Sequence, residues 1–99
     1  MEFTKLTTVE QVRHEIRRIV DERHARGPRR ADQLKPADER AELARLADLY
    51  ELRMQMWRDL AITARQADTI PDAYAEACAL AEIHDRNQMQ FWRSRAEAR

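Results

Sequence analysis

The predicted fold depends most on the segment that opens with Ile70-Pro71-Asp72-Ala73-Tyr74 and closes with Asn87-Gln88-Met89-Gln90-Phe91-Trp92-Arg93. With the period of an α-helix, His84 and Gln88 fall on the same face as its apolar side chains. These apolar members are Ala73, Ala77, Leu80, Ala81, Phe91 and Trp92. Because a buried amide or imidazole without a partner costs about 1–3 kcal/mol, both polar groups need partners. Two interpretations follow: a core His and Gln satisfied by neighbouring helices, or a polar pocket with Gln88 directed at a ligand.

Composition predicts the class of protein. Ninety-nine residues predict a single domain over 1–99, and one Gly, three Pro and abundant Ala, Leu, Arg and Glu predict an all-α chain. The 18 basic and 18 acidic residues balance, which argues against a nucleic-acid binder. A single Cys and an N-terminal segment without a hydrophobic run predict a cytoplasmic protein with no signal peptide and no membrane partner. Long helices with little core often gain burial by association, so we expect an oligomer.

Helical periodicity and prolines predict three helices, at about 8–26, 37–67 and 71–96. Thr7 and Glu10 have the spacing of a capping box at the start of the first helix, and Gly27-Pro28 should interrupt it. Thr69 is the expected N-cap of the third helix. The first buried stripe contains Val9, Val12, Ile16, Ile19 and Val20; the second contains Leu43, Leu46, Leu49, Tyr50, Trp57, Leu60, Ala61 and Ala64.

Two cations, Arg13 and Arg53, fall within these stripes, as Gln88 does in the third. Taken singly, each Arg can keep its head in water or pair with a carboxylate of the next helix. The predicted inner faces, however, contain no Asp or Glu, and a buried unpaired guanidinium is costly. We therefore expect an anionic small molecule, because the guanidinium fork binds carboxylates through two hydrogen bonds.

Other chemistries have less support. The three His residues have no Cys or carboxylate partners at zinc-ligand spacing, so no metal site is expected. Nothing near Cys78 in the sequence resembles a base that would activate a nucleophile. A phosphate-binding loop is excluded because the chain has one Gly.

Several segments resemble the small all-helical chorismate mutases, including the related isochorismate-pyruvate lyases. The resemblance lies in Val12-Arg13-x-x-Ile16-x-x-Ile19, Arg29-Arg30, Tyr50-Glu51-Leu52-Arg53, Ile70-Pro71 and Gln88-Met89-Gln90-Phe91-Trp92-Arg93. It implies a three-helix bundle in an intertwined homodimer, with Arg13 reaching into the partner's pocket. It also implies a cofactor-independent pericyclic reaction of a chorismate-like dicarboxylate, by mutase or lyase chemistry.

The candidate site residues follow from the same resemblance. Arg13, Arg30, Arg53 and Gln88 are the expected catalytic residues, and Lys35, Arg40 and His84 are the expected substrate-binding residues. The chain departs from the family pattern at two places: Gly27-Pro28 falls where the family's first helix is continuous, and Ala41 falls near the position of an expected lysine. Lys35 or Arg40 would have to replace that lysine.

The rival interpretation is a non-catalytic helical adaptor that binds another protein through its apolar faces. Its contact residues would be Met54, Met56, Trp57 and Met89. It accounts for the surplus apolar flanks and makes no use of Arg53 or Gln88.

Overall fold

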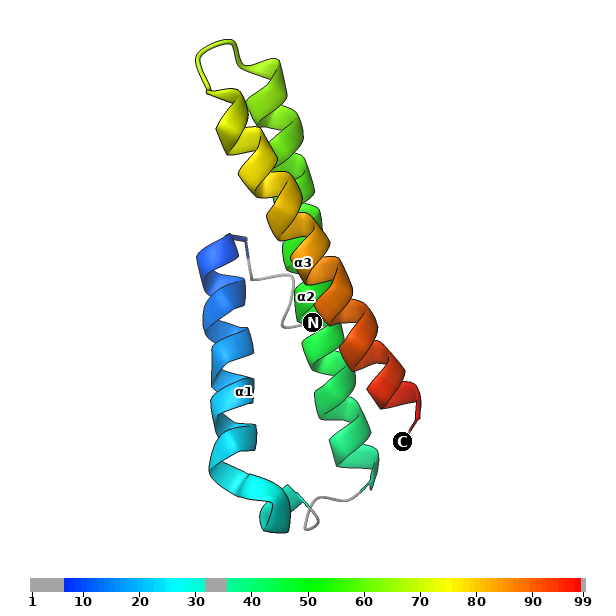
Figure 1. The fold of residues 1–99 in the computed structure, drawn as a ribbon. Helices are drawn as coiled ribbons and strands as arrows, with labels where there is room; N and C mark the ends of the chain where they lie inside the picture. Colours follow the sequence, from blue (N-terminus) through cyan, green and yellow to red (C-terminus); the bar gives the residue numbers. More distant parts are fainter. Residues whose placement is uncertain (1–6, 32–35, 99) are drawn as a thin grey trace.

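The computed structural model of the protein describes residues 7–31 and 36–98, and describes side chains outside 27–31 and 36. Within these ranges the chain forms three helices and no strand: α1 (Val9–Ala31), α2 (Pro36–Gln66) and α3 (Asp72–Glu97). The all-α, three-helix prediction is therefore confirmed. Figure 1 shows α2 and α3 as a long antiparallel hairpin, with α1 beside the N-terminal half of α2. The molecule is about 53 Å long and 24 Å wide.

The N-terminus of α1 is closed by a reciprocal capping box one residue later than predicted. The Gln11 amide donates to Thr8 Oγ1 at 3.1 Å, and Gln11 Oε1 accepts from the Thr8 amide at 3.1 Å. The Thr7 amide also donates to Gln11 Oε1, at 2.8 Å. Thr8 is therefore the N-cap, and the expected pairing of Thr7 with Glu10 is wrong.

The C-terminal end of α1 corrects the expected break at Gly27-Pro28. The helical backbone continues through both residues to Ala31, beyond the predicted end at residue 26. A proline removes its own amide donor and collides with the preceding turn, which bends a helix without always ending it. Figure 1 shows α1 bending near this end. The predicted bounds of the other two helices agree with the structure to within a residue or so, as is usual at frayed ends.

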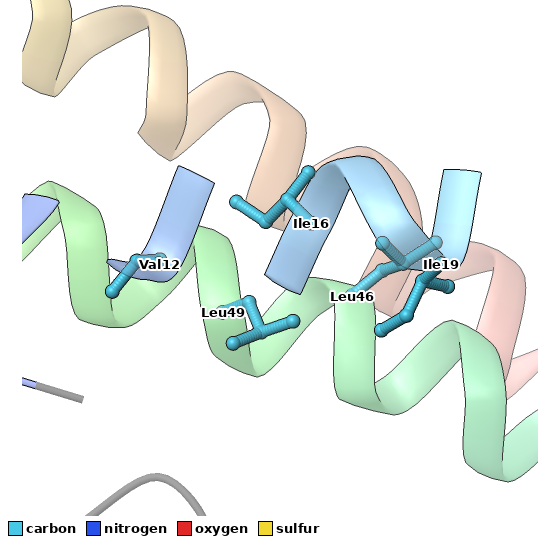
Figure 2. Packing of buried hydrophobic residues seen from close by; sticks show 5 residues of the cluster. All are labelled: Val12, Ile16, Ile19, Leu46 and Leu49. Carbon is cyan, nitrogen blue, oxygen red and sulfur yellow. The ribbon is translucent and has the colours of Figure 1, made fainter. Parts of the chain in front are cut away.

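The main core lies between α1 and α2, as the two predicted stripes require. Figure 2 shows its five buried side chains, which are Val12, Ile16, Ile19, Leu46 and Leu49. Partly buried neighbours, Trp92 of α3 among them, pack against this cluster. Full burial of an aliphatic side chain contributes about 1.5–3 kcal/mol, so this cluster fixes α1 on the hairpin.

The seam between α2 and α3 beyond α1 consists of small side chains. Ala61 and Ala64 of α2 are buried there, as are Ala75 and Cys78 of α3. Small residues at the contact let two helices approach closely. The N-cap of α3 is Pro71, which makes no side-chain capping hydrogen bond, so the expected Thr69 cap is also wrong.

The face of α3 that points inward differs from the predicted one. The buried residues of α3 are Ala75, Cys78, Asp85 and Ala96, whereas Leu80 is 68% exposed and Phe91 is 49% exposed. The inward face is rotated by roughly one residue step, or about 100°, from the predicted stripe. An apolar face of α3 therefore remains uncovered in this single chain.

No helix in the described ranges combines the length and apolar character needed to cross a membrane. Association into a dimer stays a prediction.

Candidate functional site

A cleft of about 360 Å³ opens between α1 and α2. The α1 wall contributes Arg13, Ile16, Arg17, Val20, Asp21 and His24, and the α2 wall contributes Tyr50 and Arg53. The α1 residues recur every three or four positions, so they share one face of the helix beside the buried stripe. The lining carries three guanidiniums and one carboxylate, and Ile16 and Val20 supply apolar surface.

Arg53 is held on α2 by a buried carboxylate of α3. Its Nε donates to Asp85 Oδ2 at 2.7 Å and its Nη2 donates to Asp85 Oδ1 at 2.9 Å. The Arg53 side chain is 15% exposed and that of Asp85 is 1% exposed. These hydrogen bonds raise the pKa of Arg53 against the opposing effect of burial, so the guanidinium stays charged. Its Nη1 forms no hydrogen bond with any described residue, which leaves donors for a ligand.

The Arg53–Asp85 pair corrects one premise of the sequence reasoning. The inner faces do carry an acid, because Asp85 lies at the centre of the true inward face of α3. Arg13 is not buried either: its side chain is 55% exposed, and its Nη1 lies 3.3 Å from Glu10 Oε1. Unbalanced buried cations therefore give no reason for an anionic ligand. The remaining reason is that three guanidiniums line one cleft and that Arg17 forms no ion pair with any described residue.

Tyr50 adds a neutral donor to the cleft. The Arg53 guanidinium lies over its ring, with 5.5 Å between Cζ and the ring centroid. Burial raises the pKa of the Tyr50 phenol, with the Arg53 charge opposing and the Asp85 charge adding to the effect. The phenol is therefore protonated at neutral pH, and its hydroxyl has no hydrogen-bond partner among the described residues.

Sequence reasoning missed Arg17. It is exposed, it lines the cleft, and it forms no hydrogen bond or ion pair with the described residues. The available signal was its position one helical turn from Arg13, which places both cations on one face. Asp21 and His24 continue that helix face into the cleft, and sequence reasoning did not assign them to a site either.

The remaining predicted site residues lie elsewhere. Gln88 is half-buried on α3 and does not line the cleft. His84 is 63% exposed, and its Nδ1 lies 3.1 Å from Asp85 Oδ1. Arg40 is exposed near the start of α2, outside the cleft lining. The side chain of Arg30 and the whole of Lys35 fall outside the described residues. The structure thus brings together Arg13 and Arg53 from the predicted set.

Position 41 also lies apart from the cleft. Ala41 lines a separate hollow of about 360 Å³, together with Arg18, Glu42 and Arg45 among others. A lysine at this position would therefore face a different hollow from the one that Arg53 lines.

The contact residues of the rival adaptor interpretation are mostly covered within the chain. Met54 is buried, and Met56, Trp57 and Met89 are half-buried. The large apolar side chains that are exposed are Leu60, Ile62, Tyr74, Leu80, Ile83 and Phe91. The exposed apolar side chains are therefore different residues from the predicted contact residues.

The described residues contain no group of three or more His, Cys, Asp or Glu side chains placed to hold a metal ion. Comparison of the chain with protein-family models, with curated proteins and with solved structures gave no match.

Proposed function

We propose that the cleft between α1 and α2 binds a small dicarboxylate of the chorismate or isochorismate class. The protein then rearranges this substrate, or removes its enolpyruvyl arm as pyruvate. The observation that carries the proposal is the convergence of Arg13, Arg17 and Arg53 with the Tyr50 phenol on one cleft. Arg13 and Arg53 are also positions at which the sequence resembles the helical chorismate mutases and lyases. The cleft volume falls within the range of small-molecule sites, about 300–1,000 Å³.

Pericyclic chemistry suits such a site because it needs no nucleophile. The protein must hold the substrate in a compact conformer and stabilise charge that develops at the breaking ether bond. In the proposed site, Ile16 and Val20 pack against the ring and Arg13 pairs with a carboxylate. Arg53 Nη1 and the Tyr50 hydroxyl donate toward the ether oxygen. Arg53 takes the part of the lysine expected near Ala41, because position 41 lines another hollow.

The test incubates purified protein with chorismate and, separately, with isochorismate, and follows substrate loss together with prephenate and pyruvate. Removing one donor that acts in the transition state costs about a hundredfold to a thousandfold in rate. Arg53→Lys keeps a charge but loses the planar fork, so we expect turnover to fall on that scale. Arg58→Lys is the matched control, since Arg58 lies on α2 and pairs with Glu82 of α3 away from the cleft.

Gln88→Ala tests how far the family resemblance extends. A steep loss of turnover means that the substrate also reaches α3, as the resemblance implies; unchanged turnover confines the site to the cleft. The catalytic proposal fails if neither compound is consumed and neither raises the melting temperature.

We also propose that a second copy of the chain covers the uncovered face of α3 in a homodimer. Support comes from Leu80 and Phe91, which are 68% and 49% exposed on that face. Burying one such side chain contributes about 1.5–3 kcal/mol, which favours a partner over water. In the single chain, Arg13 lines its own cleft; the intertwined arrangement would place it in the partner's. Light scattering at micromolar concentration should give the dimer mass, and Leu80→Glu should give the monomer mass. A compact monomer from the unmodified protein would refute the dimer.

The same exposed side chains favour a second candidate function, a non-catalytic helical adaptor. In that case the partner is another protein rather than a second copy. Leu80→Glu would then abolish partner capture while Arg53→Lys leaves it unchanged. Loss of turnover in Arg53→Lys, with no partner protein captured, supports the cleft as the functional site.

A further inference from the structure

Arg13 and Arg17 stand together on the α1 wall of the cleft. Both also line an adjoining hollow of about 140 Å³, with Glu10 and His14. They are one helical turn apart, so their like charges repel each other. Glu10 pairs with Arg13, at 3.3 Å between Arg13 Nη1 and Glu10 Oε1.

Arg17 has no such partner among the described residues. Asp21 lies one turn further along the same wall but forms no ion pair with Arg17, although this spacing permits one. The Arg17 guanidinium is therefore a cation held on the cleft wall with its donors available. An anion placed between Arg13 and Arg17 would relieve their repulsion and take hydrogen bonds from both.

The α2 wall differs in its electrostatics. Arg53 carries a charge that Asp85 already opposes at hydrogen-bond distance, with N–O separations of 2.7 and 2.9 Å. The groups on this wall that can still donate hydrogen bonds to a ligand are Arg53 Nη1 and the Tyr50 hydroxyl. Among the described cations of the cleft, Arg17 on the α1 wall is therefore the one without a close acidic partner, and the α2 wall offers donors with little excess charge.

We infer that Arg17 determines ligand specificity by making the cleft select dianions over monoanions. One carboxylate lies between Arg13 and Arg17 on the α1 wall. The second carboxylate belongs to the enolpyruvyl arm, on the carbon bonded to the ether oxygen, so it shares the Arg53 and Tyr50 donors of the α2 wall with that oxygen. This inference rests on the proposed function of the same cleft and adds a residue that the family resemblance does not supply.

The test uses two probes of the same shape. Isophthalate carries two carboxylates on a ring, and 3-carbamoylbenzoate replaces one of them with a neutral amide. Titration calorimetry on the full chain should show isophthalate binding at least about tenfold more tightly, since a hydrogen bond to a charged group is worth about tenfold to a hundredfold. The single carboxylate of 3-carbamoylbenzoate should accept from the positioned Arg53 and Tyr50 donors, which leaves its neutral amide between Arg13 and Arg17. Arg17→Gln should therefore weaken isophthalate, abolish the preference and leave the affinity for 3-carbamoylbenzoate unchanged.

The control is Arg18→Gln, because the neighbouring Arg18 pairs with Glu15 and Glu22 and lines a different hollow. It should retain the wild-type preference. Equal affinity of the wild-type chain for both probes, no binding of either, or a preference that survives Arg17→Gln overturns the inference. The proposed catalysis is judged separately by consumption of chorismate or isochorismate. If the chain consumes these substrates but shows no Arg17-dependent preference, the proposed function stands and the inference about Arg17 fails.

Discussion

Replacing Asp85 with alanine should destabilise the protein more than any change at an exposed acid. The substitution removes the acceptor of both Arg53 hydrogen bonds and leaves a guanidinium that is 15% exposed without its anion. Breaking a buried ion pair from one side costs about 3–5 kcal/mol. Because Arg53 borders a cleft that admits water, we expect the lower end, about 3 kcal/mol. In a domain of this size that lowers the melting temperature by roughly 12–24 °C.

Urea unfolding followed by far-ultraviolet circular dichroism measures this loss. Protein concentration must be held constant, because association makes apparent stability depend on it. Asp59→Ala is the matched control: Asp59 is exposed on α2 without an ion pair to the described residues, so it should change stability by less than about 0.5 kcal/mol.

A double variant separates the lost pair from the lost volume. Arg53→Met combined with Asp85→Leu removes both charges and keeps apolar bulk, so most of the stability should return. If Asp85→Ala costs less than about 1 kcal/mol, the pair does not hold α2 and α3 together as described.

Three further predictions concern local features. Thr8→Ala should cost about 1 kcal/mol of unfolding free energy through loss of the α1 cap, and Thr7→Ala clearly less; urea titration that ranks them the other way contradicts the observed capping box. The hydrogen bond from Arg18 lowers the pKa of Glu15 below its ordinary 4.5, so its contribution is present above about pH 4.5 and is lost as the pH falls through the lowered value. Glu15→Gln should therefore flatten the acid side of the stability profile, and an unchanged slope would exclude this role. Ala64→Leu overfills the α2–α3 seam and should cost about 1–3 kcal/mol by thermal unfolding; full stability would show that the seam has room.

Local chemistry predicted the helices well because the relevant signals are themselves local. Aliphatic residues at helical spacing defined the buried stripes of the first two helices, and their main members lie in the core. Pro36 and Pro71 lie at the starts of α2 and α3, where a missing amide donor is tolerated. The end of the first helix was predicted wrongly at Gly27-Pro28, because that prediction also used only a local signal. Whether a proline ends a helix or bends it depends on packing that the neighbouring residues do not specify.

The orientation of α3 could not be chosen from hydrophobicity alone. One candidate face carries Leu80 and Phe91, which offer more apolar area than the face with Ala75 and Cys78. The second face is the one that packs, because small side chains allow close approach to α2 and because it brings Asp85 to Arg53. Both reasons involve two helices at once. A search of every face of the third helix for an acid to pair with Arg53 would have included Asp85.

The candidate site was predicted only as far as single residues allow. Arg13 and Arg53 were identified as cations out of place in apolar stripes, and they do line one cleft. Arg17 was not among the predicted site residues, since nothing in one helix shows which exposed face a neighbouring helix will turn into a cleft. Gln88 was assigned to an inner face that packing placed elsewhere.

Arg53 contributes to stability through its pair with Asp85 and to the proposed ligand binding through its free donors, and each role limits the other. Asp85 fixes the direction of the guanidinium, which reduces the ordering needed when a ligand binds. The same carboxylate opposes most of the charge that would attract an anion from solution. Arg53 therefore discriminates between ligands by the geometry of its hydrogen bonds, but it attracts anions from solution only weakly.

That attraction must then come from cations without close acidic partners, and within the described part of the cleft Arg17 meets that condition. Orientation by Arg53 and attraction by Arg17 are therefore separable. Salt should weaken binding through the exposed Arg17 more than through the half-buried Arg53.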